Sequence, residues 1–505
     1  MKFNRISELS AVGSNPSKVC VVVRESDPSS MAASIVRARE AGGVLEFRLD
    51  YLKPEDVSAS NVGKWVELAR KPVVLTLRRR ANGGEFDGSE EAQVQILKSL
   101  CGAFIDLEIE TIETFLGGNL APLKSNSSTW IASYHNFQET PADLAAIYRR
   151  LKNSGASILK IATQALNFED NFRLLEQAQV AQQDGIPIII AAMGELGTFS
   201  RLTATGRGSL WTYASLQEGS ESAPGQFAAS ELKHLYSVDD INQSTQVYGV
   251  IGWPIGHSLS PHIHNPALRQ LGLNARYLPF SIKDLKDFGP HLRRFAGFSV
   301  TIPHKVQILD FVDVVDETVR QTGAANTIVN RGQKLFAFNT DVYGTHQALR
   351  KAFEAGIHRA TLLGTGGAAR AAALVLKERE CAVTVLARDP RKAEGFAGEF
   401  GFASDALNQA GRYEGDLLIN ATSVGMFPAI DECPVPTDAL NYRYVFDMVY
   451  NPRETHLLRE AQRESVVISG VEMFVAQAAR QFELWTGHQA PAELMRNIVL
   501  RQLAS

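Results

Sequence analysis

The 505-residue sequence has little cysteine, a small net charge and no long hydrophobic run. Its four cysteines, Cys20, Cys101, Cys381 and Cys433, are scattered, and no pair has the spacing of a metal or redox site. The formal charge of −4 provides no basic surface for nucleic acid or for a membrane. The most apolar stretch, residues 186–193, is too short to cross a bilayer. We therefore expect a cytoplasmic protein without structural disulfides, metal, nucleic-acid partner or membrane partner.

The first half of the sequence repeats one pattern, a short apolar run rich in β-branched residues followed by a helical period. Eight such runs start 23 to 31 residues apart, which leaves room for a strand, a helix and two short loops in each repeat. Eight units of this size predict an α/β fold, a parallel (β/α)8 TIM barrel over residues 1–236. The expected strands are residues 19–23, 44–48, 73–77, 104–108, 130–134, 158–162, 187–192 and 210–214.

Reactive side chains follow these strands at their carboxyl ends, where the active site of such a barrel lies. Lys160, flanked by apolar residues on the sixth strand, would lose basicity by desolvation and become an amine nucleophile toward a ketone. His135 ends the neighbouring strand and could exchange protons with an imine on that lysine. Taken alone, each residue has a structural alternative, such as a lysine paired with a barrel carboxylate. The other strand-end candidates are Glu46, Arg48, Arg78, Asp106, Glu108, Arg201, Ser222 and Gln226.

Six motifs in this half, in order, resemble type I 3-dehydroquinate dehydratase over residues 18–235. The resemblance implies that Lys160 forms a Schiff base with the C3 ketone of 3-dehydroquinate and that His135 removes the C2 proton. It also implies that Arg201 holds the substrate carboxylate, while the ring is positioned by Glu46, Arg48, Arg78, Ser222 and Gln226. The motifs are Glu-Phe-Arg-Leu-Asp (46–50), Asp-Leu-Glu (106–108), Ser-Tyr-His (133–135), Lys-Ile-Ala (160–162), Gly-Thr-Phe-Ser-Arg (197–201) and Ser-Ala-Pro-Gly-Gln (222–226).

One position departs from that family. An acidic residue usually precedes the paired glycines, whereas this sequence has Asn82 before Gly83 and Gly84. A carboxylate there would help to hold the tautomer and basicity of His135, and an asparagine contributes no charge. We therefore predict slower proton transfer at an active site, with Asp106 as the remaining carboxylate.

The second half follows a different pattern after a polar seam at residues 237–246, which we interpret as a linker. Residues 247–345 alternate strands and helices and then form a hairpin, which predicts a first lobe, to which the resemblance given below assigns substrate binding. Residues 346–470 form a regular βα series, which predicts a Rossmann lobe. The amphipathic helices of residues 471–505 are expected to complete the first lobe.

A glycine-rich loop follows the first strand of the predicted Rossmann lobe and begins an alanine-rich helix. Gly364, Gly366, Gly367 and Ala368 would let a pyrophosphate approach the backbone at the helix N-terminus. The next strand ends in a cationic turn with the side chains Arg388, Arg391 and Lys392, which favours the 2′-phosphate of NADP over NAD. Asp389, in the same turn, could instead accept hydrogen bonds from an unphosphorylated ribose, and a solvated charged turn is the non-functional alternative.

In the first lobe, Lys305 follows a strand end and Asp341 follows the hairpin. Such a pair can deliver a proton to a forming alkoxide while hydride arrives from a cofactor, although each residue alone would more often be a surface charge. Together with other motifs, this half resembles shikimate dehydrogenase over residues 247–503. The motifs lie at residues 257–261, 299–305, 323–327, 339–341, 420–426, 450–452 and 470–477.

The second resemblance implies that Lys305 and Asp341 are the catalytic pair and that NADPH reduces 3-dehydroshikimate. The substrate would be held by Ser258, Ser260, Thr301, Asn326, Tyr450 and Gln477. The nicotinamide pocket would be shaped by Thr422, Ser423, Gly470 and Met473. Ala387 replaces the asparagine that the family places before the selectivity arginine, which weakens the adenosine contact.

The two resemblances support each other, because the product of the first reaction is the substrate of the second. We predict a bifunctional enzyme that converts 3-dehydroquinate to 3-dehydroshikimate and then, with NADPH, to shikimate. One alternative is a quinate-type second half that uses NAD. Another is a non-catalytic regulatory sensor built on the same domains.

Overall fold

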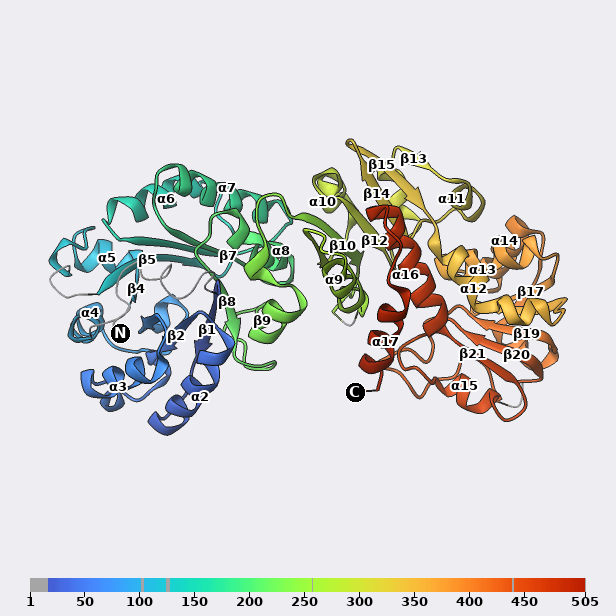
Figure 1. The fold of residues 1–505 in the computed structure, drawn as a ribbon, viewed down its shortest axis with the longest axis horizontal. Helices are drawn as coiled ribbons and strands as arrows, with labels where there is room; N and C mark the ends of the chain where they lie inside the picture. Colours follow the sequence, from blue (N-terminus) through green and yellow to red (C-terminus); the bar gives the residue numbers. More distant parts are fainter. Residues whose placement is uncertain (1–16, 101–103, 124–127, 257, 438–439, 505) are drawn as a thin grey trace. The chain divides into compact units, whose positions relative to one another are not determined.

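The computed structural model describes residues 17–100, 104–123, 128–256, 258–437 and 440–504. The chain forms two compact units, residues 1–245 and residues 246–505, and each is described by itself (Figure 1). The boundary lies between Thr245 and Gln246, at the first residue of a new strand.

The first unit is the predicted barrel. Its parallel strands follow the order β7-β6-β5-β4-β3-β2-β1-β8, with the short β9 (Phe227–Ala228) beside β8. A parallel bridge between Ile188 and Ser209 joins β7 to the segment before β8, and Leu210 N donates to Ile188 O at 2.8 Å. The strands are β1 (Val19–Val23), β2 (Val44–Arg48), β3 (Val73–Thr76), β4 (Phe104–Glu108), β5 (Thr129–Asn136), β6 (Ile158–Gln164), β7 (Ile188–Met193) and β8 (Thr212–Ser215).

Helices follow the barrel strands and cover their outer face (Figure 1). Each places an apolar stripe against the sheet, as in α6, where the buried side chains include Leu144, Ile147 and Leu151. The helices are α2 (Pro28–Ala41), α3 (Ala59–Ala69), α4 (Glu90–Ser99), α5 (Ile109–Phe115), α6 (Leu144–Asn153), α7 (Glu169–Gln183) and α8 (Thr198–Thr203).

The barrel interior is apolar at the level where the strands begin and polar one layer higher. Side chains two residues apart on a strand share a face, so Glu46 lies above Val44, Asp106 above Phe104 and Lys160 above Ile158. The lower layer belongs to a buried cluster that contains Val44, Phe104, Ile131, Ile158, Ile189 and Trp211. The apolar floor therefore fixes the height at which the charged groups meet.

The predicted linker packs against the barrel unit over most of its length. Val238 and Ile241 are buried, and Val238 O accepts a hydrogen bond from Thr205 Oγ1 at 3.2 Å. Lys18 N donates to Asp239 Oδ1 at 2.6 Å. This segment shows no hydrophobic period because polar residues such as Asp239 interrupt it, and Asp239 forms a contact with the first unit.

The second unit begins with a six-stranded sheet of order β11-β10-β12-β14-β15-β13, in which β14 runs antiparallel to β12 and β15. Helices α16 (Gly470–Thr486) and α17 (Ala492–Gln502) pack on this lobe, where Phe474, Phe482 and Met495 join a core with Val250 and Ile263. The other elements of the lobe are β10 (Gln246–Gly252), α9 (Ser260–Gln270), β11 (Ala275–Ser281), α10 (Leu285–Phe288), β12 (Gly297–Val300), β13 (Val314–Val315), α11 (Glu317–Thr322), β14 (Thr327–Arg331) and β15 (Lys334–Phe338).

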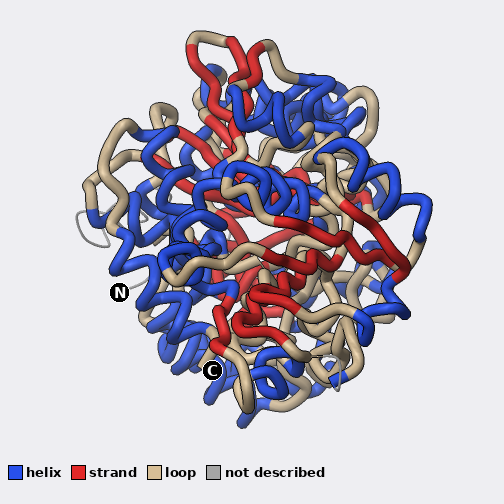
Figure 2. Tube along the Cα trace, turned by 90° about the vertical axis from the view of Figure 1, so that its right-hand side faces the viewer, coloured by secondary structure: helices blue, strands red, loops and turns tan. Residues whose placement is uncertain are grey.

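The second lobe is the predicted Rossmann fold. Its parallel sheet has the order β18-β17-β16-β19-β20-β21, and helices cover it on both faces (Figure 2). The direction of the strand order changes between β16 and β19, which creates a crevice at their carboxyl ends where ligands bind in such sheets. The elements are α12 (Thr340–Glu354), β16 (Arg359–Leu363), α13 (Gly367–Glu378), β17 (Ala382–Ala387), α14 (Pro390–Phe400), β18 (Ala403–Ala406), β19 (Gly415–Asn420), β20 (Tyr442–Asp447), α15 (His456–Ala461) and β21 (Val466–Ser469).

A buried histidine should make the second unit sensitive to acid. His264 is 1% exposed and stacks on Tyr277, and neither ring nitrogen has a hydrogen-bond partner within the described chain. Burial lowers the pKa of His264 to about 3, from 6.5. Below pH 6.5 the unfolded chain therefore binds a proton that the native unit does not, so the free energy of unfolding falls as the pH is lowered.

We expect His264→Phe to remove this loss. Between pH 7.5 and pH 5.0 the stability of the variant relative to the original protein should rise by about 2 kcal/mol. Urea unfolding of the second unit at both pH values, with His234→Phe as a control in the first unit, measures the change. A pH-independent difference would mean that His264 does not stay neutral in the native unit.

Candidate active sites

Lys160 lies in the barrel among carboxylates. Its Nζ is 2.9 Å from Asp106 Oδ2 and 3.7 Å from Glu46 Oε1, and it lies 4.5 Å from the centroid of the Tyr213 ring. Burial alone would raise the pKa of Asp106, but the cations Lys160 and Arg78 hold it well below its ordinary value. The lysine is thus fixed in position at the carboxyl ends of the strands, beside two carboxylates.

Arg78 connects the lysine's partners to His135. Its guanidinium donates to Asp106 Oδ1 at 3.0 Å and to Glu108 Oε1 at 3.1 Å, and Nη1 lies 3.1 Å from His135 Nδ1. An arginine can only donate, so Nδ1 is the acceptor and a neutral His135 carries its proton on Nε2. Burial lowers the pKa of His135 well below 6.5, and Arg78 and Lys160 lower it further. The histidine is therefore a neutral base at pH 7.

Arg201 is a buried cation whose charge is not balanced by an acid in the described part of the barrel. It is 3% exposed, Nη2 donates to Pro224 O at 3.0 Å, and Nε has no partner among the described atoms. Burial lowers the pKa of Arg201 to about 10. An anion brought to this guanidinium would compensate the cost of burying the charge.

The loops after β7 and β8 meet at the same carbonyl. Pro224 O also accepts from Gly194 N at 3.1 Å, and Gln226 Oε1 accepts from Ser222 N at 2.7 Å and Ser222 Oγ at 3.1 Å. These contacts bring Arg201, Ser222 and Gln226 together, as the sequence predicted they would converge.

Glu46 and Arg48 are held by residues that the sequence reasoning did not select as site residues. Glu46 Oε1 accepts from Thr76 Oγ1 at 2.8 Å, and Arg48 forms a two-point contact with Asp50 at 2.9 and 2.8 Å. Gln93, on α4, donates to Glu108 Oε2 at 2.8 Å. Asp50 belongs to the motif at residues 46–50. Gln93 lies on a helix rather than at the end of a strand, so its position in the sequence does not indicate a role in the site.

The Asn82 segment reaches His135 through an aromatic ring. A Cβ on Gly83 would lie 2.5 Å from the ring of Phe137, which stacks on His135 with centroids 6.2 Å apart. The side-chain oxygen of Asn82 is buried and has no hydrogen-bond partner among the described residues. A carboxylate at this position would add a second negative charge beside that of Asp106 to oppose the effect of Arg78 and Lys160 on His135.

We expect Asn82→Asp to speed up dehydration by roughly 2- to 10-fold, because the added charge raises the basicity of His135. The lower limb of the pH profile of kcat/KM should move to higher pH, since the base is lost by protonation at a higher pH. Steady-state rates of the purified chain on 3-dehydroquinate measure both effects, with Asn82→Ala as the uncharged comparison. Equal rates for aspartate and asparagine would contradict the predicted slow proton transfer.

In the second unit, Lys305 Nζ lies 2.5 Å from Asp341 Oδ2, and Asp341 Oδ1 accepts from Asn326 Nδ2 at 2.8 Å. Asn326 Nδ2 also lies 3.2 Å from Gln477 Oε1. Asp341 is in the first turn of α12, where Asn339 caps the helix and the helix dipole favours a carboxylate. The structure thus brings together Lys305, Asp341, Asn326 and Gln477, four residues from separate segments.

Gln481 supports these four residues, although the sequence did not indicate it. Its Nε2 donates to Asn326 O and Thr327 Oγ1, both at 3.0 Å, and its Oε1 accepts from Ser299 Oγ at 2.8 Å. Gln481 lies one helical turn after Gln477 on α16, so the i, i+4 spacing could have indicated it.

The other predicted substrate residues belong to the same lobe or pack against it. Ser258 Oγ accepts from Ser260 N at 3.3 Å at the start of α9, and Ser260 is buried. Thr301 directly follows β12, and Tyr450 stacks on Phe474 with centroids 4.1 Å apart. His257 of the quoted motif lies outside the described residues.

The glycine-rich loop follows β16 at the crevice. Gly364 has a φ of +103°, and its Cβ would lie 3.0 Å from Thr422 Cγ2. A Cβ on Gly367 would lie 2.8 Å from Lys305 Cδ, so the helix start and the lysine approach each other only because this residue has no side chain. Gly366 caps α13, and Ala368 follows in its first turn. The loop fits a pyrophosphate held at a helix N-terminus.

The selectivity turn follows β17. Arg388, Arg391 and Lys392 are exposed, whereas the carboxylate of Asp389 caps α14 by accepting from Arg391 N at 3.0 Å. Asp389 is thus engaged by the helix, which reduces its value as a ribose acceptor and leaves three cations for a 2′-phosphate.

The predicted nicotinamide residues lie at the carboxyl ends of β19 and β21. Thr422 N and Thr422 Oγ1 donate to Asn420 Oδ1 at 3.1 and 2.7 Å, with Ser423 next in the loop. Gly470 starts α16, and Thr345 Oγ1 on α12 donates to Met473 Sδ at 3.8 Å.

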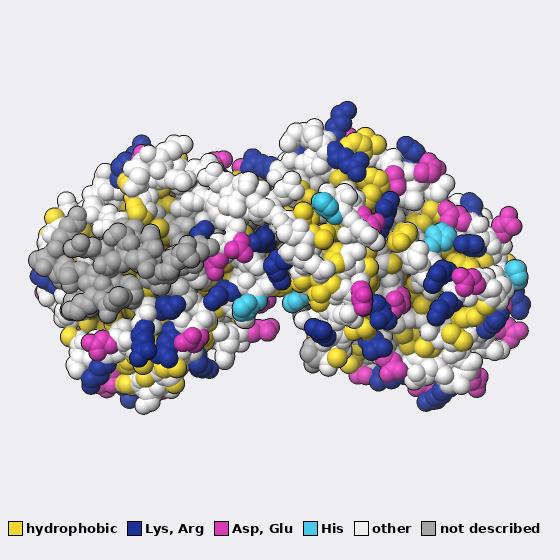
Figure 3. Space-filling view, in the orientation of Figure 1, with side chains coloured by type: hydrophobic (Ala, Val, Ile, Leu, Met, Phe, Trp, Pro, Cys, Tyr) yellow, Lys and Arg dark blue, Asp and Glu magenta, His cyan; other side chains and the backbone are white. Residues whose placement is uncertain are grey.

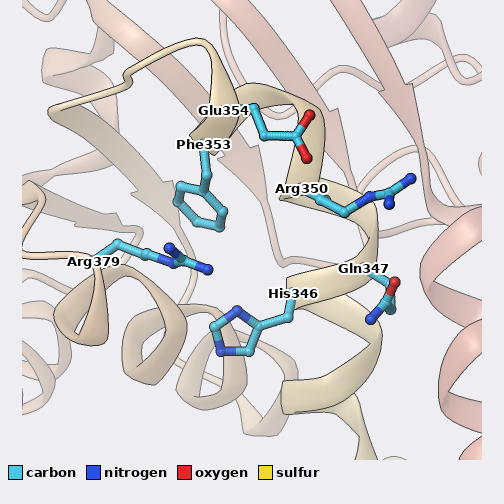
Figure 4. Close-up of a pocket in the computed structure, with 6 residues that line it drawn as sticks. All are labelled: His346, Gln347, Arg350, Phe353, Glu354 and Arg379. Atoms are coloured by element: carbon cyan, nitrogen blue, oxygen red, sulfur yellow. The ribbon is translucent and has the colours of Figure 1, made fainter.

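A separate surface hollow lies on the outer face of α12 (Figure 4). It is lined by His346, Gln347, Arg350, Phe353, Glu354 and Arg379. Its cations are accompanied by acids, since His346 pairs with Glu378 at 2.8 Å and Glu354 lines the hollow. None of the predicted site residues lines it, so it provides no alternative site.

The described residues contain no group of three or more His, Cys, Asp or Glu side chains placed to hold a metal ion. Among the described helices, none has the length and hydrophobicity needed to cross a membrane. Basic and acidic side chains alternate over the face shown in Figure 3.

Comparisons with known proteins match both units. The model of "Type I 3-dehydroquinase" matches residues 19–243, "Shikimate dehydrogenase substrate binding domain" matches residues 250–328, and "Shikimate 5'-dehydrogenase C-terminal domain" matches residues 470–500. A chloroplastic bifunctional 3-dehydroquinate dehydratase/shikimate dehydrogenase of Arabidopsis thaliana is 34% identical over 96% of this chain and 84% of its own length. A shikimate dehydrogenase (NADP(+)) of Bacillus subtilis is 39% identical over 51% of this chain and 98% of its own length. The crystal structure of the Thermus thermophilus shikimate 5-dehydrogenase with NADP(H) and shikimate is 35% identical, covers 51% of this chain and 99% of that one, and has a TM-score of 0.46.

Proposed function

The chain belongs to the family of bifunctional 3-dehydroquinate dehydratase/shikimate dehydrogenases, and from this we propose that Lys160 with His135 and Lys305 with Asp341 carry its two reactions. It is a lyase and an NADP-dependent oxidoreductase of the shikimate pathway. The convergence of Lys160, Asp106, Arg78 and His135 in one barrel is the observation that carries the first assignment.

For dehydration, Lys160 loses its proton to solvent and its amine attacks the C3 ketone of 3-dehydroquinate, and loss of water leaves an imine. The imine withdraws electrons from C2, and the neutral His135 takes the C2 proton. The resulting enamine expels the C1 hydroxyl, which leaves as water with the proton from His135. Hydrolysis of the product imine releases 3-dehydroshikimate and restores the Lys160 amine.

Substrate orientation in the barrel is assigned to Arg201, whose unbalanced buried charge suits the substrate carboxylate. Ser222 and Gln226, tied to the same loop pair, would contact the ring hydroxyls or carbonyl. Glu46, Arg48 and Arg78 face the same space from the ends of β2 and β3.

For reduction, NADPH would supply a hydride to the ketone carbon of 3-dehydroshikimate, C3. Lys305 would give a proton to the carbonyl oxygen, while Asp341 holds the lysine and binds a substrate hydroxyl. Asn326 orients Asp341 and Gln477. The remaining contacts to the substrate would come from Ser258, Ser260, Thr301 and Tyr450. The three exposed cations after β17 would bind the 2′-phosphate.

The shikimate dehydrogenase relatives named for NADP(+) favour this assignment over a quinate-type second half that uses NAD. A non-catalytic sensor would not require the Lys305–Asp341 pair. A cytoplasmic location stays a prediction, since the Arabidopsis relative is chloroplastic. The domain boundaries that we propose are 1–236 for the barrel, 237–246 for the connection, 247–345 with 471–505 for the substrate lobe, and 346–470 for the Rossmann lobe.

The decisive experiment supplies 3-dehydroquinate to the purified chain and follows the loss of NADPH and the formation of shikimate. We expect one NADPH to be oxidised per 3-dehydroquinate consumed. NADH and quinate serve as the competing cofactor and substrate. Turnover of quinate with NAD at a higher kcat/KM than of shikimate with NADP would favour the quinate-type alternative, and binding without turnover would favour the sensor.

A further inference from the structure

Asp447, at the carboxyl end of β20, is a fully buried carboxylate with no role in the two proposed reactions. Its Oδ1 accepts from Asn420 Nδ2 at 2.9 Å and from Val449 N at 3.0 Å, and its Oδ2 accepts from Thr455 Oγ1 at 2.6 Å. All three donors are neutral, and burial raises the pKa of Asp447 to about 6. A carboxylate that is costly to bury, yet has no cationic partner among these donors, indicates a positional requirement.

The first contact fixes the loop on the nicotinamide side. Because Asn420 Nδ2 must face the carboxylate, its Oδ1 faces the loop and accepts from both Thr422 N and Thr422 Oγ1. Thr422 Oγ1 in turn accepts from Val424 N at 3.2 Å, and Asn420 Nδ2 reaches Val424 O at 3.3 Å. Asp447 therefore sets the amide orientation on which the conformation of residues 422–424 depends.

The second contact fixes the segment on the substrate side. Val449 N is held by Asp447, and Val449 O packs where a Cβ on Gly470 would lie at 2.6 Å. The next residue is Tyr450, stacked on Phe474 of α16. The third donor, Thr455, caps α15 and so attaches the same carboxylate to the helix that follows.

We propose that Asp447 is a positioning residue for hydride transfer, which holds the loop of residues 422–424 and the segment Val449–Tyr450 in fixed positions relative to each other at the carboxyl ends of β19 and β20. The inference rests on the proposed dehydrogenase function. Hydride transfer depends on sub-ångström placement of donor and acceptor, and a misplacement of about 1 Å can cost on the order of 100-fold in rate. Asp447 does so without touching the substrate or cofactor itself.

The test compares Asp447→Ala with Asp447→Asn in the full chain. Alanine removes both acceptor oxygens and so all three hydrogen bonds, whereas asparagine keeps one oxygen for Asn420 and Val449, and the Thr455 hydroxyl can turn to accept from its amide. Reduction of added 3-dehydroshikimate is measured with NADPH and with NADPH deuterated at the transferred position. The original chain must first show this reaction, which separates a failure of the proposed function from a failure of the inference.

We expect Asp447→Ala to lower kcat for reduction by about 10- to 100-fold and to increase the primary deuterium isotope effect on kcat, because hydride transfer becomes the slow step. Asp447→Asn should restore most of both. Dehydration of 3-dehydroquinate by the same chain should not change. Asp416→Asn is the matched control, since Asp416 accepts from His358 N and Arg359 N at the opposite end of the same sheet.

An unchanged kcat and isotope effect in a folded Asp447→Ala chain, even with a lower unfolding temperature, would overturn the inference. If that variant does not fold, Thr455→Val and Thr455→Ser carry the test. Valine loses the hydroxyl that donates to Asp447, and serine keeps it. A raised isotope effect in the valine variant alone would support the inference, and equal behaviour of the two would refute it.

Discussion

Lys160→Ala should abolish dehydration of 3-dehydroquinate, with kcat reduced by on the order of 10⁴-fold or more, while reduction of added 3-dehydroshikimate continues at the original rate. The reason is that the alanine variant has no amine to form the imine, so the C2 proton keeps its ordinary acidity and His135 has no activated site to deprotonate. In the coupled assay NADPH should not be consumed until 3-dehydroshikimate is supplied.

Sodium borohydride provides a second measurement for Lys160. Reduction in the presence of 3-dehydroquinate should trap one covalent adduct on the original chain, at Lys160, and none on the variant. Lys152→Ala is the matched control, because Lys152 is an exposed barrel lysine paired with Asp184 at 2.7 Å. Normal dehydration by Lys160→Ala, or trapping on another lysine, would show that the Schiff-base assignment is wrong.

Lys305→Ala should give the converse result. Dehydration should proceed normally and 3-dehydroshikimate should accumulate, because reduction loses its proton donor and slows by roughly 10²- to 10⁴-fold. Asp341→Asn should also slow reduction, since its neutral amide no longer forms the ion pair with Lys305, which lies 2.5 Å from the carboxylate.

Chromatographic measurement of 3-dehydroshikimate and shikimate during turnover distinguishes these outcomes. The exposed Lys286, on α10 of the same lobe, provides the control variant Lys286→Ala, which should behave like the original chain. If Lys305→Ala reduces 3-dehydroshikimate at the original rate, another group donates the proton.

The fold could be predicted where buried strands produce unbroken apolar runs. All eight barrel strands have such runs, and the TIM barrel and Rossmann lobe are confirmed. Edge strands such as β13 and β18 give no such run, because an edge strand is half-exposed and its sequence, as in Ala403–Ala406, lacks the apolar signal. The seam looked like a free linker because single buried residues, such as Val238 and Ile241, show no period.

The sequence located site residues at strand ends because the geometry of parallel sheets gathers those positions. The sequence did not indicate the residues that support these site residues through hydrogen bonds. Gln93 and Gln481 lie on helices, and Asp447 ends a strand but points to neutral donors inside the lobe. The role of Asp389 also needed coordinates, since only the hydrogen bond to Arg391 N shows that it caps a helix.

The packing of α16 and α17 on β10 and α9 has a consequence for synthesis on the ribosome. The barrel strands and helices lie together within the first unit, so the barrel can fold while the second unit is still being translated. The core around Val250 and Ile263 instead waits for Phe474 and Met495. At typical elongation rates this wait lasts about 10 to 40 s. During that time the apolar face of the substrate lobe is uncovered.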